Sequence, residues 1–545
     1  MTLRSSRSKA LSLLALAASG LLVSLPAAAM DGGGQSRMLR SLPDGALPSD
    51  CLSPVFLEMA WSISPYFAEP PQLADPQVWV TADGRVAVHY TTQRGSSDAV
   101  PIADVNRNGL PDAVEAGGDG AAETLLTADS GGWLMPFSPS YRLEVFLANL
   151  GGTTHGYYIP SSVTSRGFAV VDSRLFTDTQ LLKAISAHQA AHAILSGYDR
   201  AEPLWWHEAT ASLIEVLSQG SVGRHTEAME RILAAPEKGL LPDDLGRGAT
   251  GLIWASYLAE SGGGAELVRQ IWNEEALVEG NNLFDATDRV LSRQGRTLIS
   301  AFADFTTWNL FTGLRDDRQH YSFGGLLSDP RAVATHSLFP AGSAGQAVAP
   351  LGWSLIRFEP DGAGGGVQIA FEGDDAGSWQ ADLLLGSRHG TTSFRRVALP
   401  IDGSGRASLG VPWGEAAEVL LLVRNVRTSG PGATFTWSVR PAPAYPFELG
   451  SLSADPEPGQ VQVNWETESE ENLAGWDVYR SEGRAGFQRI SEITIPAVGG
   501  SDGTVGYQFI DDAVRPGAAY QYYVVGLTLD GLTQRSFIVT TRIPR

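Results

Sequence analysis

Two histidines four residues apart are the residues of this sequence best suited to binding a metal ion. His188 and His192 lie in the segment AISAHQAAHAIL, and on a helix both imidazoles would point to the same side and reach one ion. Leu181, Ile185 and Leu195 follow the same face at intervals of three and four residues, so this face should be turned toward the protein interior. Because a buried polar ring without a partner is costly, either a metal or buried hydrogen-bond partners must satisfy the two imidazoles.

A carboxylate on the next expected helix offers a third ligand. Glu208 lies in the segment WWHEATA, which follows Pro203, a residue suited to the first turn of a helix. Two imidazoles and one carboxylate leave a fourth coordination position open, which is the ligand pattern of a catalytic zinc site. In an alternative, His207 is the third ligand and Glu208 is free to act as a base, although adjacent helical residues diverge by about 100°. We expect zinc at His188, His192 and Glu208.

A second metal-binding pattern is the segment DVNRNGLPDAVE, residues 104–115. Side-chain oxygens occur at positions 1, 3, 5, 9 and 12, a glycine occupies position 6, and position 7 offers a backbone carbonyl, as in the twelve-residue calcium loop. The expected calcium ligands are Asp104, Asn106, Asn108, Leu110, Asp112 and Glu115. Two neutral ligands and a single loop favour a weak structural clamp over a sensor. An ion-free Asx turn is the alternative.

Together these segments resemble the zinc metallopeptidases of the HExxH, glutamate-ligand (gluzincin) type. The sequence is most similar to secreted bacterial proteins that combine HExxH, a W-x-x-E-A-T-A helix, a D-x-N-x-N-G-x-P-D segment and C-terminal β-sandwich modules. The resemblance extends from the hairpin near Val78 to about Tyr321, and it implies zinc ligands at His188, His192 and Glu208. Glu208 follows His192 by sixteen residues, a shorter spacing than in thermolysin-like members.

The sequence departs from that family at one position that matters for catalysis. Gln189 stands where the family has the glutamate of HExxH, which accepts a proton as zinc-bound water attacks the peptide carbonyl. An amide can orient water but cannot take up its proton at neutral pH, and losing a positioned base costs about 10²–10⁴-fold in rate. We therefore expect a pseudoprotease that keeps a metal site. The alternatives are an active metalloendopeptidase with another base, or a glutamate-to-glutamine change introduced into an active enzyme.

A peptidase of this type also needs a hydrogen-bond donor for the oxyanion that forms during the reaction. Tyr198, His225, His320 and Tyr321 are available in the same expected domain. His320 and Tyr321 directly follow the helical block and are the preferred catalytic candidates, although a structural role is the more common one for such residues.

The elements that must position these groups change in kind along the chain. Period-two segments and turns predict a β-hairpin at residues 78–90 and strands at 143–147 and 168–171. From about residue 177 the apolar period becomes three to four, which predicts helices at 178–195, 203–217, 226–234, 251–260, 265–272, 283–293 and 298–311. Strands followed by helices indicate an α+β domain and not a doubly wound sheet.

Short alternating segments, such as residues 367–371 and 419–423, and Gly-rich turns follow residue 330, which is typical of β-sandwiches. The segments VQVNWETESEENLAGWDVYRS and RPGAAYQYYVVGL resemble a fibronectin type III-like domain, with Tyr520 at the place of its corner tyrosine. The expected fold is multidomain, with an α+β zincin-like metallopeptidase domain followed by two all-β sandwich domains. The expected boundaries are signal peptide 1–29, N-terminal lead-in 30–75, metallopeptidase domain 76–329, β-sandwich domain 330–445 and fibronectin type III-like domain 446–545.

The N-terminal residues predict where the protein acts. Arg4, Arg7 and Lys9 precede an apolar stretch that ends in small residues near Ala29, the pattern of a cleaved secretory signal peptide, with an uncleaved membrane anchor as the alternative. No later apolar run is long enough to cross a bilayer. We therefore expect a secreted, cell-surface or periplasmic protein without a membrane span after cleavage, in which Cys51 is a buried or incidental thiol.

The composition limits the classes of partner. With 43% hydrophobic and 18% charged residues, the chain should be globular and neither a disordered acidic tail nor a coiled coil. A net charge of -21 argues against nucleic-acid binding, because phosphates would be repelled. The expected partners are a peptide or protein ligand and, through the β-sandwiches, a cell surface or glycan. A non-enzymatic adhesion or binding protein is the rival function.

Overall fold

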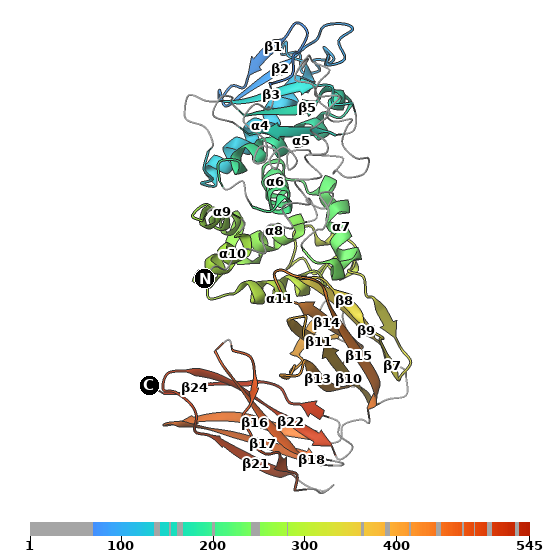
Figure 1. The fold of residues 1–545 in the computed structure, drawn as a ribbon, viewed down its shortest axis with the longest axis vertical. Helices are drawn as coiled ribbons and strands as arrows, with labels where there is room; N and C mark the ends of the chain where they lie inside the picture. The colour runs from blue at the N-terminus through green and yellow to red at the C-terminus, as the bar shows by residue number, and fades with distance from the viewer. Residues whose placement is uncertain are drawn as a thin grey trace, which may run out of the picture. The chain divides into compact units, whose positions relative to one another are not determined.

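The computed structural model (Figure 1) describes most of the chain after residue 68. The described residues are 69–544, apart from 136–141, 152–153, 161–166, 199–201, 241–250, 279, 281, 361–364, 387–392, 414–415, 443–447, 471–472, 484, 499–503 and 529–532. The expected signal peptide, most of the expected lead-in and Cys51 lie outside them. The described residues fall into two compact units, one built from residues up to 122 with 139–190, the other from 123–138 with 191 onward.

The first unit contains a five-stranded mixed sheet of order β1-β2-β3-β5-β4. Strands β2, β3 and β5 are parallel, whereas β1 and β4 are antiparallel to their neighbours and form the two edges. Its strands are β1 (Gln77–Val80), β2 (Val86–Tyr90), β3 (Leu143–Ala148), β4 (Gly156–Ile159) and β5 (Phe168–Asp172). Nearly every residue of β3, β4 and β5 is buried, which is typical of strands covered on both faces.

A helix that the apolar pattern did not predict, α4 (Asp112–Ser130), lies between β2 and β3. It makes a β-α-β crossover between two parallel strands, so the expectation of strands first and helices afterwards is wrong for this part of the chain. Three glycines of α4 argue against a helix by propensity. They allow close packing instead: a Cβ at Gly118 would lie 2.2 Å from the ring of Trp79, and one at Gly120 would lie 2.1 Å from the backbone oxygen of Lys183 on α5 (Thr179–Leu195).

The second unit begins with a group of helices whose bounds agree with the apolar periodicity to within a few residues. They are α6 (Leu204–Gln219), α7 (Thr226–Ala234), α8 (Leu252–Leu258), α9 (Gly264–Glu275), α10 (Leu283–Arg293) and α11 (Leu298–Trp308). Local signals set their ends. α6 stops at Gly220, whose φ of 69° is left-handed, and α11 starts with a capping box between Thr297 and Ser300.

Two sheets then pack face to face around one apolar core. Their orders are β12-β11-β14-β9-β6 and β13-β10-β15-β7, with β8 also paired to β15. Buried residues of both sheets, such as Ile356 and Phe371, belong to the same core, which makes this part a β-sandwich. The strands are β6 (Ala334–His336), β7 (Ala341–Gly342), β8 (Gln346–Val348), β9 (Gly352–Phe358), β10 (Gly366–Gly373), β11 (Trp379–Gly386), β12 (Phe394–Ala398), β13 (Arg406–Pro412), β14 (Glu418–Asn425) and β15 (Ala433–Ala442).

A second pair of sheets follows, with order β16-β17-β21 in one and β19-β18-β22-β23 in the other, where β20 pairs with β18 and β24 with β22. Trp465 and Trp476 lie in their common core. The hydroxyl of Tyr520 accepts a hydrogen bond from the backbone N–H of Arg515 at 3.0 Å, which is the contact expected of a corner tyrosine. The strands are β16 (Glu448–Glu457), β17 (Gln460–Ser469), β18 (Leu473–Glu482), β19 (Gln488–Arg489), β20 (Ile495–Pro496), β21 (Val505–Asp511), β22 (Ala519–Thr528), β23 (Thr533–Arg535) and β24 (Val539–Arg542).

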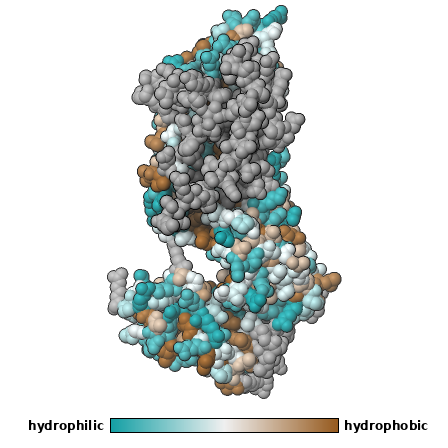
Figure 2. All heavy atoms as spheres, viewed as in Figure 1, coloured by the Kyte–Doolittle hydropathy of each residue, from teal (hydrophilic) through white to brown (hydrophobic). Residues whose placement is uncertain are grey.

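On the face drawn in Figure 2, hydrophobic side chains are scattered among hydrophilic ones over the coloured residues. Among the helices that the structure describes, none combines the length and the apolar character that a membrane span requires.

Candidate metal centre

The two expected histidine ligands lie on α5, and the expected carboxylate lies on α6. His188 and His192 are one helical turn apart and are 2% and 0% exposed. Glu208 is in the second turn of α6 and is 4% exposed. Pro203 is the N-cap of α6 with φ −56°, and its carbonyl oxygen accepts a hydrogen bond from the N–H of Trp206 at 2.8 Å. Three polar groups are thus held inside the protein by two helices.

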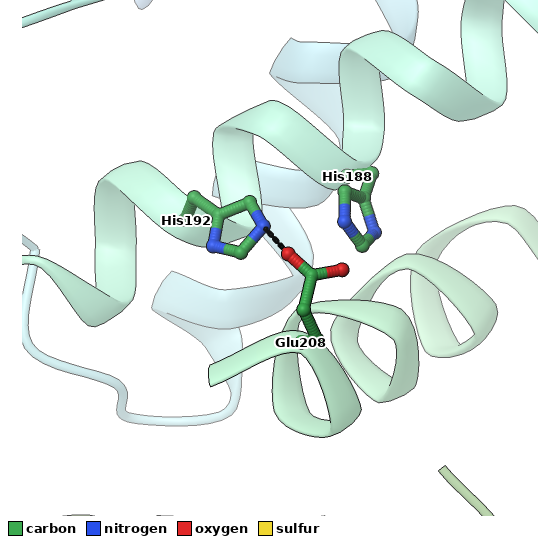
Figure 3. Close-up of side chains that lie close together, drawn as sticks. All are labelled: His188, His192 and Glu208. Carbon is green, nitrogen blue, oxygen red and sulfur yellow. Dashed lines mark ion pairs between the residues drawn. The ribbon is translucent and has the colours of Figure 1, made fainter. Parts of the chain in front are cut away.

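The three side chains converge. The Nε2 atom of His192 lies 2.9 Å from Oε1 of Glu208, and His188, His192 and Glu208 each offer a ligand atom within 4.8 Å of the others. Figure 3 shows both imidazoles turned from one helix toward the carboxylate of the other. This group could hold a metal ion.

The chemistry of the donor set fits a divalent ion. A tetrahedral zinc ion with bonds of about 2.0–2.1 Å needs ligand atoms about 3.3 Å apart, so small side-chain rotations would bring atoms within 4.8 Å of one another to that spacing. Nitrogen from histidine and oxygen from a carboxylate are both usual zinc ligands. A cation there would also compensate the negative charge of the buried Glu208 carboxylate.

Gln189, at the position expected for a general base, is fully buried next to His188 on α5. A Cβ added to Gly156, the first residue of edge strand β4, would lie 3.2 Å from Nε2 of Gln189 and 3.0 Å from the side chain of Ile185. The amide therefore lies against the start of β4. A carboxylate at this position would be equally enclosed.

His207 does not belong to the group of candidate ligands that the described residues form. Its ring packs edge-on against Trp272 of α9, with 4.9 Å between the ring centroids and 66° between the planes. The structure therefore brings Glu208, and not His207, together with His188 and His192.

The preferred oxyanion candidates, His320 and Tyr321, contact other residues. Nδ1 of His320 lies 2.9 Å from Oδ1 of Asp317, and its ring stacks on Phe311 with centroids 3.9 Å apart. Tyr321 is buried and donates its hydroxyl proton to Oδ1 of Asn309 at 2.8 Å. Burial holds the pKa of Tyr321 well above its ordinary value. These contacts are structural, and a catalytic role for either residue stays a prediction.

The two further candidates, Tyr198 and His225, also have structural partners. The hydroxyl of Tyr198 accepts a hydrogen bond from the backbone N–H of Leu134 at 2.7 Å, and burial raises its pKa. Nε2 of His225 lies 3.1 Å from Oε2 of the buried Glu215. Neither residue is part of the candidate metal group.

The expected calcium loop is closed by hydrogen bonds to its own oxygens. The Asp104 carboxylate accepts from the backbone N–H groups of Asn108 at 3.1 Å and Gly109 at 2.8 Å. The N–H of Leu110 donates to the side-chain oxygen of Asn108. Gly109 has φ 89° and Arg107 has φ 60°, so the sharp turn uses the left-handed region that the glycine at position 6 permits.

The remaining expected calcium ligands complete the same loop. Asp112 accepts from the backbone N–H of Val105 at 3.1 Å. Glu115, in the first turn of α4, accepts from the side-chain amide of Asn106 at 2.8 Å and from that of Asn108. These hydrogen bonds tie the predicted ligand side chains into one closed loop, and the calcium ion itself stays a prediction.

Sequence reasoning missed the contacts between α6 and α9 that hold α6 in place. Trp272 donates its indole N–H to Oγ1 of Thr210 at 3.1 Å and stacks on Trp206, with 6.2 Å between centroids and an 8° interplanar angle. Trp206 and Thr210 are four residues apart on one helical face, which was available as a signal. Their partner Trp272, however, follows Thr210 by 62 residues in the chain.

Comparisons with known proteins leave the family open. No protein-family model matches the chain, and no curated protein matches it. Among solved structures, the pectate lyase Pel3 from Pectobacterium carotovorum is similar at 26% identity over 17% of this chain and 26% of its own, with a TM-score of 0.14. The FN1–FN3 domains of chicken CNTN1 are similar at 14% identity over 33% of this chain and 56% of theirs, with a TM-score of 0.16.

The adhesin domain of Epf from Streptococcus pyogenes is similar at 10% identity over 37% of this chain and 71% of its own, with a TM-score of 0.14. The chain spans about a quarter of the length of the pectate lyases that it matches. With TM-scores this low, none of these likenesses bears on the fold or on the function.

Proposed function

We propose that this protein is a secreted, zincin-like metal-binding protein that holds zinc at His188, His192 and Glu208 and hydrolyses peptides poorly or not at all. The convergence of these three buried side chains within 4.8 Å is the observation that carries the proposal. Zinc is favoured over calcium or magnesium here because two of the three ligands are imidazoles.

The residues around the site explain why the metal would not suffice for catalysis. Bound zinc would polarise a substrate carbonyl and lower the pKa of a coordinated water. Gln189, enclosed beside His188 and near β4, has an amide that can donate and accept hydrogen bonds but cannot accept the proton released by that water.

The proposal includes the rest of the expected architecture. In this proposal, the β1–β5 sheet and helices α4 to α11 form the zincin-like domain expected at residues 76–329, and the two sandwiches form the domains expected at 330–445 and 446–545. The hydrogen bond between Arg515 and Tyr520 supports a fibronectin type III-like assignment for the last domain. Calcium at residues 104–115 would clamp the start of α4.

Zinc stoichiometry tests the metal site directly. The purified parent should bind one zinc ion per chain by elemental analysis after dialysis, whereas His188→Ala should bind none, because one imidazole and one carboxylate are too few ligands for tight binding. His336→Ala is the matched control, since His336 lies in the first β-sandwich. Equal zinc content in the parent and His188→Ala would contradict the proposal.

Proteolysis tests the role of Gln189. Digestion of unfolded casein should be absent with the parent and should appear with Gln189→Glu in a zinc-dependent way, because the substitution supplies the missing base. Gln189→Asn, which restores no carboxylate, is the matched control. Zinc-dependent cleavage by the parent would favour the active-enzyme alternative. A parent that neither binds zinc nor gains activity as Gln189→Glu would favour the adhesion alternative.

A further inference from the structure

The side of α6 that faces away from the candidate ligands is packed against α9. At about 100° per residue, Trp206 and Thr210 lie roughly 160° from Glu208 on either side of the helix, so they form its opposite face. Both are fully buried, as is Trp272 of α9. The two helices are joined there by the stack of Trp206 on Trp272 and by the hydrogen bond from Trp272 to Thr210.

We propose that Trp272 and Thr210 are positioning residues for the metal site: their hydrogen bond fixes the rotation of α6 that aims Glu208 at His192. The inference rests on the proposed zinc site and deepens it, because it identifies residues that would set the affinity of that site. Neither residue is a ligand, and neither belongs to the candidate metal group.

Geometry shows why a single contact matters. A carboxylate at the tip of a helical side chain lies about 5–6 Å from the helix axis, so a rotation of α6 by about 10° moves it by about 1 Å. Metal–ligand distances are held to within about 0.2 Å. The flat stack of Trp206 on Trp272, at 8° between planes, allows sliding, whereas the hydrogen bond at 3.1 Å is directional. The hydrogen bond is therefore the directional contact closest to Glu208 that opposes rotation of α6 toward or away from α9.

A second contact fixes the start of the same helix without fixing its rotation. The carboxylate of Glu202, two residues before α6, accepts hydrogen bonds from the backbone N–H groups of Asn282 and Leu283, both at 3.0 Å, at the beginning of α10. This contact limits translation of the first turn of α6. The rotation of the helix then depends on contacts further along it. Thr210 supplies one polar contact near Glu208, and Glu215 and Ser218 supply others toward the end of the helix.

Substitutions at Thr210 test the proposal through metal affinity. Thr210→Val keeps the shape of the side chain and removes the hydrogen-bond acceptor. We expect its zinc affinity, measured by competition with a chromophoric chelator, to fall about tenfold. Losses of this size are typical when a residue that supports a metal ligand is changed. Thr210→Ser keeps the hydroxyl and should bind zinc within about threefold of the parent. Trp272→Phe should match Thr210→Val, and the double variant should be no weaker, because both remove the same contact.

A matched control separates positioning from general stability. Thr287 is a buried threonine on α10 whose hydroxyl has no hydrogen-bond partner within the described chain, so Thr287→Val should leave zinc affinity unchanged. Affinities are compared at a temperature where circular dichroism shows every variant folded, and Co²⁺ absorption reports the ligand geometry. Parent-like zinc affinity and Co²⁺ spectrum in Thr210→Val would overturn the inference, even if its melting temperature fell. A parent that binds no zinc would instead overturn the proposed function.

Discussion

At the scale of single residues, Glu274 on α9 shows how charge stabilises the helical region. Its carboxylate accepts a hydrogen bond from Nε of Arg289 at 2.8 Å and another from Arg293. The hydrogen bond from Arg293 is the largest influence that lowers the pKa of Glu274 below its ordinary value. A lowered folded-state pKa stabilises the protein above the unfolded-state pKa of about 4.3, and this contribution is lost as the pH falls through the folded-state value.

We therefore expect Glu274→Gln to be less stable than the parent at pH 7, by less than about 1 kcal/mol because the arginines are partly exposed. The difference should shrink below pH 4, where the parent loses the same contribution. Urea unfolding at pH 7 and pH 3.5 measures it. Glu227→Gln is the control, since Glu227 is largely exposed. A stability difference that grows toward low pH would contradict the assignment.

The candidate ligands could be predicted from sequence because they are local in the chain. His188 and His192 are separated by one turn of a single helix, and Glu208 by one short connection, so spacing and helical periodicity were enough to bring them together. Trp272 could not be predicted as a partner of Thr210, because their contact depends on how α9 packs against α6. Periodicity states which face of a helix is buried, not what buries it.

At the scale of elements, the crossing of α4 and α5 depends on Gly120. A Cβ there would lie 2.1 Å from the backbone oxygen of Lys183, whereas the nearest atoms to a Cβ at Gly117 would be the side chains of Leu147 and Leu182, at 3.4 Å. We expect Gly120→Ala to destabilise the protein by about 1–3 kcal/mol through overpacking. Gly117→Ala, the matched control, should be neutral or stabilising by up to about 1 kcal/mol.

Urea denaturation followed by circular dichroism compares the two variants. Equal midpoints would mean that α4 and α5 do not approach as closely as described.

The same glycines explain why α4 was missed. Summed helix propensity counts them as helix breakers, but the close approach to another backbone is the reason for glycine at position 120. Strand β4 was missed because its four residues, GYYI, are too short for an alternation to be recognised.

The loop before α4 gives an ion-dependent prediction. If calcium binds at residues 104–115, adding it to metal-free protein should stabilise the parent by about 2.7 kcal/mol at a hundred times the dissociation constant. Glu115→Gln, which removes the bidentate ligand, should need far more calcium for the same rise in melting temperature. Asp129→Asn, a charge-matched change on the last turn of α4, should respond like the parent. No calcium response in the parent would favour the ion-free Asx turn.

At the scale of the whole molecule, Arg424 links the helices of the second unit to the first β-sandwich. This fully buried side chain on β14 pairs with Asp382 on β11 and donates hydrogen bonds to the backbone oxygen of Ala303, at 3.2 Å, and to Thr306, both on α11. Burial lowers the pKa of Arg424 and the charge of Asp382 opposes that shift. Removing one partner of such a pair leaves the other charge buried without compensation, which strongly destabilises the protein.

Arg424→Met should lower the stability of the second unit by about 3–5 kcal/mol, toward the lower value because Arg396 still contacts Asp382 at 2.9 Å. Differential scanning calorimetry measures the change. Arg406→Met is the control: its ion pair with Glu372 is exposed, so the melting temperature should barely move. Equal effects of the two substitutions would show that the buried pair does not join helices and sandwich.

The order of the sheets was less predictable than their existence. Alternating segments indicated strands near residues 367–371, 419–423, 461–465 and 520–524, and β10, β14, β17 and β22 contain them. Which strands become neighbours depends on pairings between segments far apart in the chain, such as β10 with β15. No local pattern encodes those pairings, because the same alternation suits any partner with one buried face.

The packing of tryptophans between α6 and α9 also affects the fluorescence of the protein. Trp205 and Trp206 lie on α6 three and two residues before Glu208, and Trp206 stacks on Trp272, so these indoles belong to the helix that carries the candidate carboxylate ligand. Cobalt bound to that ligand would quench part of their ultraviolet emission, whereas zinc, with a filled d shell, would not. If the proposed site binds metal, the tryptophan emission would report the exchange of zinc for cobalt.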